Sequence, residues 1–160
     1  MPLQLTIRES LVIAAPPDRV WDYTQDYARR PDWDSSIFEA RVLSLAPRAV
    51  AIRGRALRCT FRYKVDDRPR RTSLAMHDVQ SPILEGGGGA WRYRAVPAGT
   101  HWTQINTLRF RGTFWPRLLR PLLVWSLRLQ TRRAMRRASR RITAGLTEPT
   151  LPRRCRFGAA

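Results

Sequence analysis

Lysine and cysteine are nearly absent from this chain of 160 residues, and acidic residues are scarce in its second half. Lys64 is the only lysine, so arginine carries almost all of the formal net charge of +18. The two cysteines, Cys59 and Cys155, are too few and too far apart for a disulfide framework. Two cysteines and two histidines without ligand spacing also exclude the usual zinc motifs, so no metal and no cofactor is expected.

Long hydrophobic runs are missing as well. Residues 1–10 lack the basic region and the apolar run of a secretory signal. The apolar run from Leu122 to Trp125 is far too short to cross a bilayer, which takes about 20 residues. These absences predict a cytoplasmic, reduced protein, and they leave association with a membrane surface open.

The composition suits a single globular domain. A chain of this length buries roughly 70% of the surface that it exposes when unfolded. The hydrophobic share of 43% supplies enough material for a core. We therefore expect one domain over residues 1–146, followed by a loose, disordered tail over residues 147–160.

The pattern predicts a strand, two short helices, several strands and a long helix. Residues 3–14 are typical of a strand, and the double proline that follows predicts a helix over residues 17–26. A helical turn over residues 27–30 should end at Pro31, because the residue before a proline is pushed out of the helical region. Glycines 86–89 are interpreted as a flexible turn. The remaining strands are predicted at residues 37–45, 50–65 with a break or bulge at Gly54, 72–79, 91–96 and 100–111.

The last predicted element is a helix over residues 114–146, with a kink or a break at Pro121. Its first part, residues 118–129, is apolar almost all round, so we expect this part to be gripped by the sheet. Its second part keeps only a narrow apolar stripe and carries many arginines. We expect the second part to project and to be the place for a partner.

The positive charge of the second half has two interpretations. Glu148 is the only acidic residue beyond Glu85, so this half is strongly basic. Codon usage and an ordinary solvated helix face would explain the charge without any partner. An anionic partner such as RNA, a ribosome or an acidic membrane surface would explain it equally. The candidate basic surface consists of Arg128, Arg132, Arg133, Arg136, Arg140 and Arg141.

Four stretches carry a resemblance to a known family: residues 9–22 (ESLVIAAPPDRVWD), 31–34 (PDWD), 97–100 (PAGT) and 118–129. In this order the chain resembles the START/Bet v 1-like (SRPBCC) superfamily, often labelled polyketide cyclase/dehydrase. The resemblance implies an α+β helix-grip fold, in which a curved antiparallel sheet of about six or seven strands wraps around the long C-terminal helix. It also implies two short helices after the first strand and a cavity for an apolar ligand. The superfamily mixes carriers, cyclases and ribosome-associated proteins, so the activity depends on the site.

A ligand cavity needs apolar walls and a few polar groups that orient the ligand. Gln104 and Asn106 fall on the inner face of their strand, where they would either bind a ligand carbonyl or hydroxyl or form a structural network. Trp33 would serve either as a lid or as a cap on the core. The inward phases of the strands add Phe61, Tyr63, Leu74, Met76, Trp91, Tyr93 and Trp102 to the predicted lining.

No catalytic constellation is visible, so no catalytic residue is assigned. His77 should face outward, whereas Asp78 shares the phase of Leu74 and could be an inward acid or an exposed one. Three hypotheses follow in this order: carriage of a hydrophobic small molecule (a lipid, a quinone or a polyketide-like compound), a cyclase or dehydratase acting on a polyketide-like substrate, and a basic module that docks on RNA, a ribosome or an acidic membrane.

Overall fold

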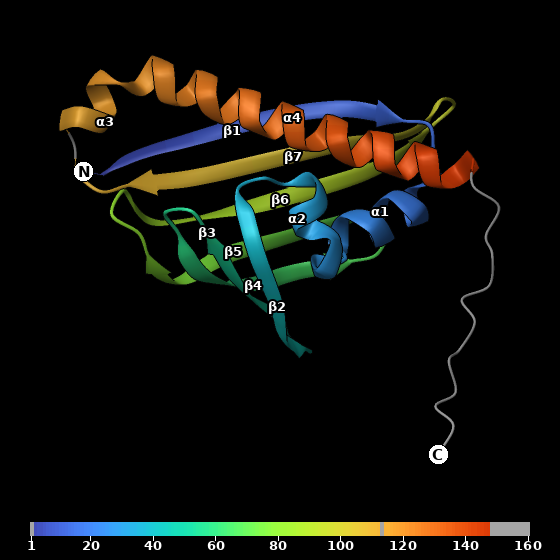
Figure 1. The fold of residues 1–160 in the computed structure, drawn as a ribbon, viewed down its shortest axis with the longest axis horizontal. Helices are drawn as coiled ribbons and strands as arrows, with labels where there is room; N and C mark the ends of the chain where they lie inside the picture. Colours follow the sequence, from blue (N-terminus) through green and yellow to red (C-terminus); the bar gives the residue numbers. More distant parts are fainter. Residues whose placement is uncertain (1, 113, 148–160) are drawn as a thin grey trace.

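The computed structural model, which describes residues 2–112 and 114–147, contains one antiparallel sheet of seven strands with a long helix lying along it (Figure 1). The strands are β1 (Leu3–Ile13), β2 (Ile37–Leu45), β3 (Arg48–Gly54), β4 (Arg58–Asp67), β5 (Arg71–Gln80), β6 (Leu84–Val96) and β7 (Gly99–Phe110). The helices are α1 (Pro17–Gln25), the 3-10 helix η1 (Tyr27–Arg29), α2 (Arg30–Trp33), α3 (Phe114–Leu118) and α4 (Arg120–Thr147). The predicted helix-grip fold is confirmed.

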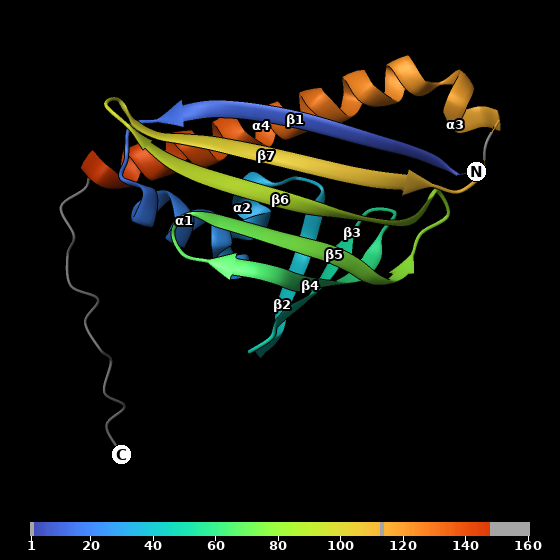
Figure 2. The ribbon, with the colours of Figure 1, turned by 180° about the vertical axis from the view of Figure 1, so that it is seen from behind.

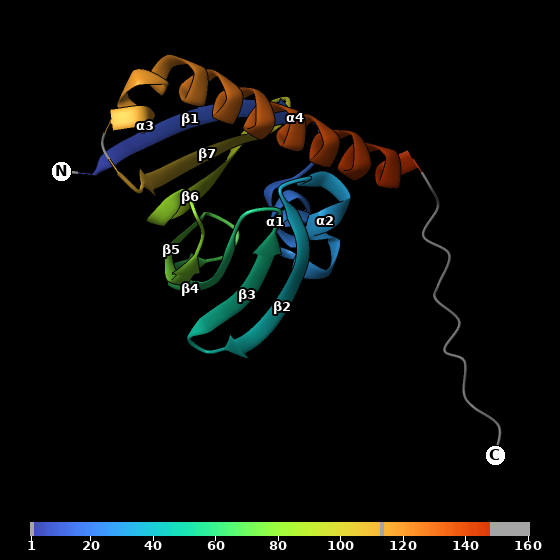
Figure 3. The ribbon, with the colours of Figure 1, turned by 60° about the vertical axis from the view of Figure 1, so that its left-hand side comes forward.

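The sheet is curved, and the helices lie on its concave side. The strand order is β1-β7-β6-β5-β4-β3-β2, so the first strand pairs with the last. Figure 3 shows the sheet curling from β1 and β7, beside α4, round to β2 and β3, with α1 and α2 inside the curve. Seen from behind in Figure 2, the convex face carries no helix among the described residues. The concave face is therefore where a site can form. The predicted tail, apart from Thr147, lies outside the described residues.

Proline positions explain where the short helices begin, but the expectation for Pro31 was wrong. Pro17 begins α1, where a missing N–H leaves no hydrogen bond unmade. Pro31 was expected to end a helical turn, but it lies in the first turn of α2 instead. Proline is tolerated in the first turn of a helix, and at Pro31 this tolerance outweighs the steric effect of the proline on the residue before it. The consequence is that Trp33 is held on a helix.

The glycine run was also expected to form a turn, but it lies within β6. Gly88 opposes Ala75 of β5 and Thr107 of β7 in the two ladders. A Cβ on Gly88 would lie 2.6 Å from the backbone oxygen of Leu74, so the neighbouring strands approach too closely for a side chain. Glycine in a strand interior commonly marks such a close approach. Gly54, in contrast, does separate two strands, because β3 ends there.

The long helix is gripped by its second half, which reverses the expectation from the sequence. Met135, Ala138 and Ile142 are at most 2% exposed and belong to the main core. The first half contributes only half-buried residues to a smaller apolar cluster around Leu5 and Phe110. Small side chains such as Ala138 let the backbone of the helix approach the sheet and α1. No helix in the described part of the chain combines the length and apolarity of a membrane span.

Substitutions in the glycine run test its place in β6. Gly88→Ala should destabilise the fold by about 1–3 kcal/mol, because the new methyl group would force β5 and β6 apart. Gly89→Ala is the matched control, since its Cβ would meet only the side-chain oxygen of Asn106 at 3.4 Å and a backbone oxygen at 3.6 Å. Its unfolding free energy should change by no more than about 0.5 kcal/mol. Equilibrium unfolding in urea measures both, and equal effects would contradict this placement.

Candidate functional site

The residues predicted to line a cavity gather on the concave face of the sheet and on α2. Gln104 is buried beside them on β7, whereas Met76 and Asn106 are half-buried. The other predicted lining residues are buried in one core cluster: Trp33, Phe61, Tyr63, Leu74, Trp91, Tyr93 and Trp102. The alternation of the strands brings the strand residues to one face, and α2 adds Trp33 to it.

Aromatic rings pack tightly at the centre of this face. Trp33 is fully buried and meets Trp102 edge-on, with the ring centroids 5.9 Å apart. Tyr93 stacks on Trp102, with its ring centroid 6.3 Å from that of the tryptophan. Such pairs are favourable beyond the area that they bury. Trp33 therefore packs within the core cluster, and its predicted role at a ligand cavity stays a prediction.

A hydrogen-bonded tyrosine network connects α1 and η1 to the sheet. Gln25 donates from Nε2 to the hydroxyl of Tyr93 at 2.9 Å and accepts at Oε1 from the hydroxyl of Tyr63 at 2.7 Å. Tyr63 in turn shares a hydrogen bond of 2.8 Å with Tyr27. The guanidinium of Arg48 lies 4.8 Å from the ring centroid of Tyr63 and closes this side. Every member has a partner, so the network is a fixed wall.

Burial keeps these phenols neutral. Desolvation raises the pKa of Tyr93 to about 12, and it also raises the pKa of Tyr27 and Tyr63 above the ordinary value. Their hydroxyl groups are therefore hydrogen-bond donors and acceptors at neutral pH, and they do not act as bases.

Five N–H donors close to the aromatic centre have no acceptor in the described part of the chain. They are Nη1 of Arg30, Nε1 of Trp33, Trp91 and Trp102, and Nε2 of Gln104. The guanidinium of Arg30 lies 4.2 Å from the ring centroid of Trp33 and 4.8 Å from that of Trp91. Gln104 opposes Trp91 in the β6–β7 ladder. We call these five side chains the donor cluster.

The donor cluster is chemically one-sided. It offers N–H groups and no free carboxylate, because Asp34 already accepts from Arg30 at 3.1 Å. An unpaired buried donor costs roughly 1–3 kcal/mol, so acceptor oxygens brought to this cluster would be strongly favoured. The arrangement suits the carbonyl or hydroxyl oxygens of a ligand.

Apolar side chains that pack against the two core clusters remain partly exposed. Leu57 and Val79 pack against both the main core and the smaller cluster, which places them between the two. Met76 and Leu127 are likewise half-buried. Asn106 donates to Thr131 of α4 at a long 3.4 Å, so this predicted residue contacts the helix. Some apolar side chains at the edges of the two core clusters are thus only partly covered.

A buried carboxylate anchors α4 to the sheet. The side chain of Glu9 on β1 is only 8% exposed and accepts from Nε of Arg132 at 2.6 Å. Nε of Arg128 lies 3.7 Å from its other oxygen. Two members of the predicted basic surface therefore have an internal partner. The remaining four, Arg133, Arg136, Arg140 and Arg141, make no ion pair among the described residues.

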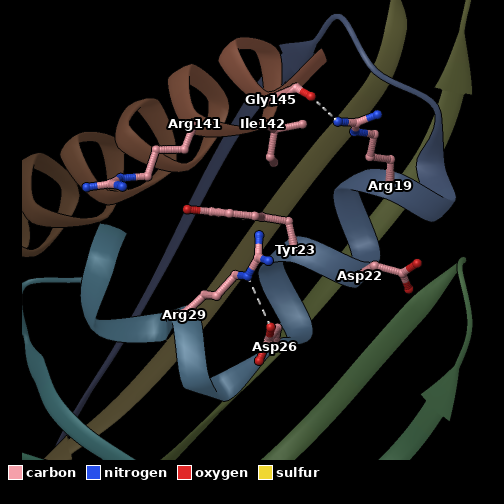
Figure 4. Close-up of a pocket in the computed structure, with 8 residues that line it drawn as sticks. All are labelled: Arg19, Asp22, Tyr23, Asp26, Arg29, Arg141, Ile142 and Gly145. Atoms are coloured by element: carbon pink, nitrogen blue, oxygen red, sulfur yellow. Dashed lines mark hydrogen bonds and ion pairs between the residues drawn. The ribbon is translucent and has the colours of Figure 1, made fainter. Parts of the chain in front are cut away.

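One of these four lines a separate pocket of about 270 Å³ between α1 and the end of α4, shown in Figure 4. Arg141 and Tyr23 face each other across it, and the hydroxyl of Tyr23 is buried without a hydrogen-bond partner among the described residues. Arg29 is 3.3 Å from Asp26 at its edge. Asp22 is paired with Arg68, so both aspartates of the lining already have a partner, whereas Arg141 makes no ion pair in the described part of the chain.

Catalytic candidates from the sequence lie outside the concave face. His77 is exposed, and Asp78 has a side chain 70% exposed that lies 4.0 Å from Arg62. A positive φ of 53° at Asp78 breaks the alternation of β5, which turns this carboxylate away from the phase of Leu74. Of the two positions considered for Asp78, the exposed one is correct.

Sequence reasoning missed Glu9, Gln25, Tyr27 and Arg30. One signal was present, because Glu9 shares the strand phase of Leu5 and Ile7 and should have been suspected as buried. Arg30 had no such signal, since its position depends on the unexpected helix α2. Gln25 and Tyr27 lie at the junction of two short helices, where periodicity is too brief to assign a face.

The tyrosine network predicts a loss of stability at high pH. The folded protein holds the phenol proton of Tyr93 more tightly than the unfolded chain, whose tyrosines titrate near about 10. The contribution of Tyr93 to the unfolding free energy should therefore be constant below about pH 10 and should fall as the pH rises toward about 12. Phenolate absorbance measures the titration, with chain unfolded in guanidinium as control. Ionisation of the buried tyrosines near pH 10 with native circular dichroism would contradict it.

Known proteins share this architecture. The protein TTHA0849 from Thermus thermophilus superposes with a TM-score of 0.75 and 18% identity, over 88% of this chain and 99% of that chain. The Zhui aromatase/cyclase from Streptomyces sp. R1128 also gives a TM-score of 0.75, with 16% identity over 90% of this chain and 96% of that chain. Ara h 8.0201 gives 0.66, with 10% identity over 89% and 99% of the two chains. At these identities the likeness shows the fold.

No curated protein sequence matches the chain. Residues 4–148, in contrast, match the model of one family over nearly the whole domain. The resemblance in the sequence is thereby confirmed, and the chain belongs to the family described as polyketide cyclase / dehydrase and lipid transport.

Proposed function

We propose that this protein binds and carries a hydrophobic small molecule, with the oxygen-bearing end of the molecule at the donor cluster. The observation that carries the proposal is the set of five buried N–H donors that have no acceptor among the described residues, in an apolar core. The family to which the chain belongs includes lipid transport in its description. A cytoplasmic location suits the free buried thiol of Cys59.

The donor cluster favours one class of ligand over others. A saturated hydrocarbon would leave every donor unpaired, whereas a quinone or a polyketide-like molecule presents several acceptor oxygens on an apolar ring system. Flat rings would also pack well against Trp91 and Trp102. We therefore rank quinones and polyketide-like compounds above simple fatty acyl chains.

Cyclisation of a polyketide-like substrate is the second candidate. The names of related structures support it, because one is an aromatase/cyclase and another is a di-domain ARO/CYC of the steffimycin pathway. The donor cluster would polarise a ketone and so make the neighbouring C–H more acidic. A base must then remove that proton. The buried carboxylates Glu9 and Asp34 are engaged by arginines, which favours carriage.

Binding of two ring compounds that differ in oxygen content tests the proposal. Emodin, a polyhydroxyanthraquinone, should quench the intrinsic tryptophan fluorescence at lower concentration than anthracene does. Gln104→Leu should weaken emodin binding about fivefold, since it replaces one donor by an apolar side chain of similar size, and should leave anthracene binding unchanged. Thr107→Val is the matched control, because Thr107 pairs with the exposed Thr6 on the convex face.

Failure of both compounds to bind, together with no co-purifying ligand in native mass spectrometry, would refute carriage. Equal loss in the Gln104 and Thr107 variants would refute the role of the donor cluster. Recovery of a bound polyketide-like compound with its mass changed, by loss of water on ring closure, would favour the cyclase over the carrier.

A further inference from the structure

Large apolar side chains are exposed together on α3 and the start of α4. They form what we call the α3–α4 apolar surface: Phe114 (70% exposed), Trp115 (66%), Leu118 (62%), Leu119 (44%), Leu122 (57%) and Trp125 (61%). Scattered apolar residues on a surface are ordinary, but a contiguous group of this kind marks an interaction site.

This surface lies at one end of the molecule. Figure 1 places α3 and the first turns of α4 at the end opposite the last turns of α4. Ile83, which is 54% exposed, belongs to the same end, because its backbone oxygen accepts from Arg111 just before α3. Two elements far apart in the sequence therefore contribute apolar side chains to the same end.

The outward face of α4 changes from apolar to basic along the helix. Leu122, Trp125 and Leu129 recur at helical spacing on the side opposite the buried Met135 and Ala138. The same side then continues as Arg133, Arg136 and Arg140, all exposed. At a rise of 1.5 Å per residue, Trp125 and Arg136 are about 17 Å apart along the axis. No acidic residue interrupts residues 114–147.

We propose that the α3–α4 apolar surface docks on an anionic phospholipid bilayer. Trp115 and Trp125 would lie at the interface, where tryptophan is favoured, and the leucines would enter the acyl region. Arg133, Arg136 and Arg140 would then contact the headgroups of the same leaflet. This inference does not depend on the proposed ligand, although docking would bring the concave face close to a source of hydrophobic molecules.

Two other partners fit the surface less well. RNA would use the arginines and could stack on a tryptophan, but it offers nothing to Leu118 and Leu122. A second copy of the chain would bring two strongly positive helices together, against a net charge of +18 on each. An anionic bilayer satisfies the apolar and the basic parts at once.

Flotation with vesicles tests the docking. The full-length protein should bind vesicles of phosphatidylcholine and phosphatidylglycerol at low salt, and should bind pure phosphatidylcholine at least tenfold more weakly. Trp115→Ser combined with Trp125→Ser should reduce binding at least tenfold. Its matched control is Phe38→Ser with Leu45→Ser, because these side chains are 54% and 81% exposed on β2. Circular dichroism verifies that each variant is folded.

The basic half has its own variant and control. Arg133→Gln, Arg136→Gln and Arg140→Gln together should lower binding to the anionic vesicles, by about fivefold for each arginine, and should flatten its salt dependence. Arg8→Gln, Arg92→Gln and Arg94→Gln remove the same charge from exposed positions on the convex face. They should lower binding far less, because those arginines would not contact the membrane.

Several outcomes would overturn the proposal. The first is no binding to anionic vesicles at low salt, and the second is an equal loss of binding in the α3–α4 variants and in their controls. The third is binding of RNA that is tighter than vesicle binding and that the tryptophan variant does not affect. The fourth is a dimer in analytical ultracentrifugation that only the tryptophan variant dissociates. None of them bears on emodin binding, so this test and that of the ligand fail independently.

Discussion

The ion pair between Glu9 of β1 and Arg132 of α4 determines how the long helix lies on the sheet. A carboxylate that is 8% exposed is costly to bury without a partner, by several kcal/mol, so the helix must present an arginine at this point. Once Arg132 is fixed, helical geometry sends Met135 and Ala138 into the core and Arg133 and Arg136 into water. The same orientation of the helix about its axis leaves Trp125, in the preceding turns, exposed.

This anchoring divides α4 in a way that hydrophobicity alone does not suggest. The second half of α4, which has few apolar residues and mostly small ones, is the gripped half. Its alanines let the helix backbone approach the sheet closely, and its apolar side chains are almost completely buried. The half with many leucines and tryptophans has more apolar surface than the narrow end of the sheet can cover. The excess apolar side chains are left exposed on the outside of the helix.

The concave face combines two kinds of polar group with different consequences. The tyrosine network is satisfied throughout and holds α1 and η1 in place. The donor cluster is not satisfied, and its members are fixed by ring packing and by the pair of Arg30 with Asp34. A rigid wall therefore lies in the same core as polar groups that have no partner among the described residues.

The strand alternation in the sequence by itself determined the inner-face residues from Phe61 to Gln104, and the resemblance to a known family implied the fold. The sequence also determined the family, through the double proline, the following Val-Trp-Asp and the order of elements. Only the tertiary structure decided the place of Arg30, the strand position of Gly88 and which half of α4 is gripped. Periodicity reports which residues share a face, but it does not report which neighbour covers that face. That depends on long-range packing, such as the pairing of Glu9 with a helix more than a hundred residues away in the chain.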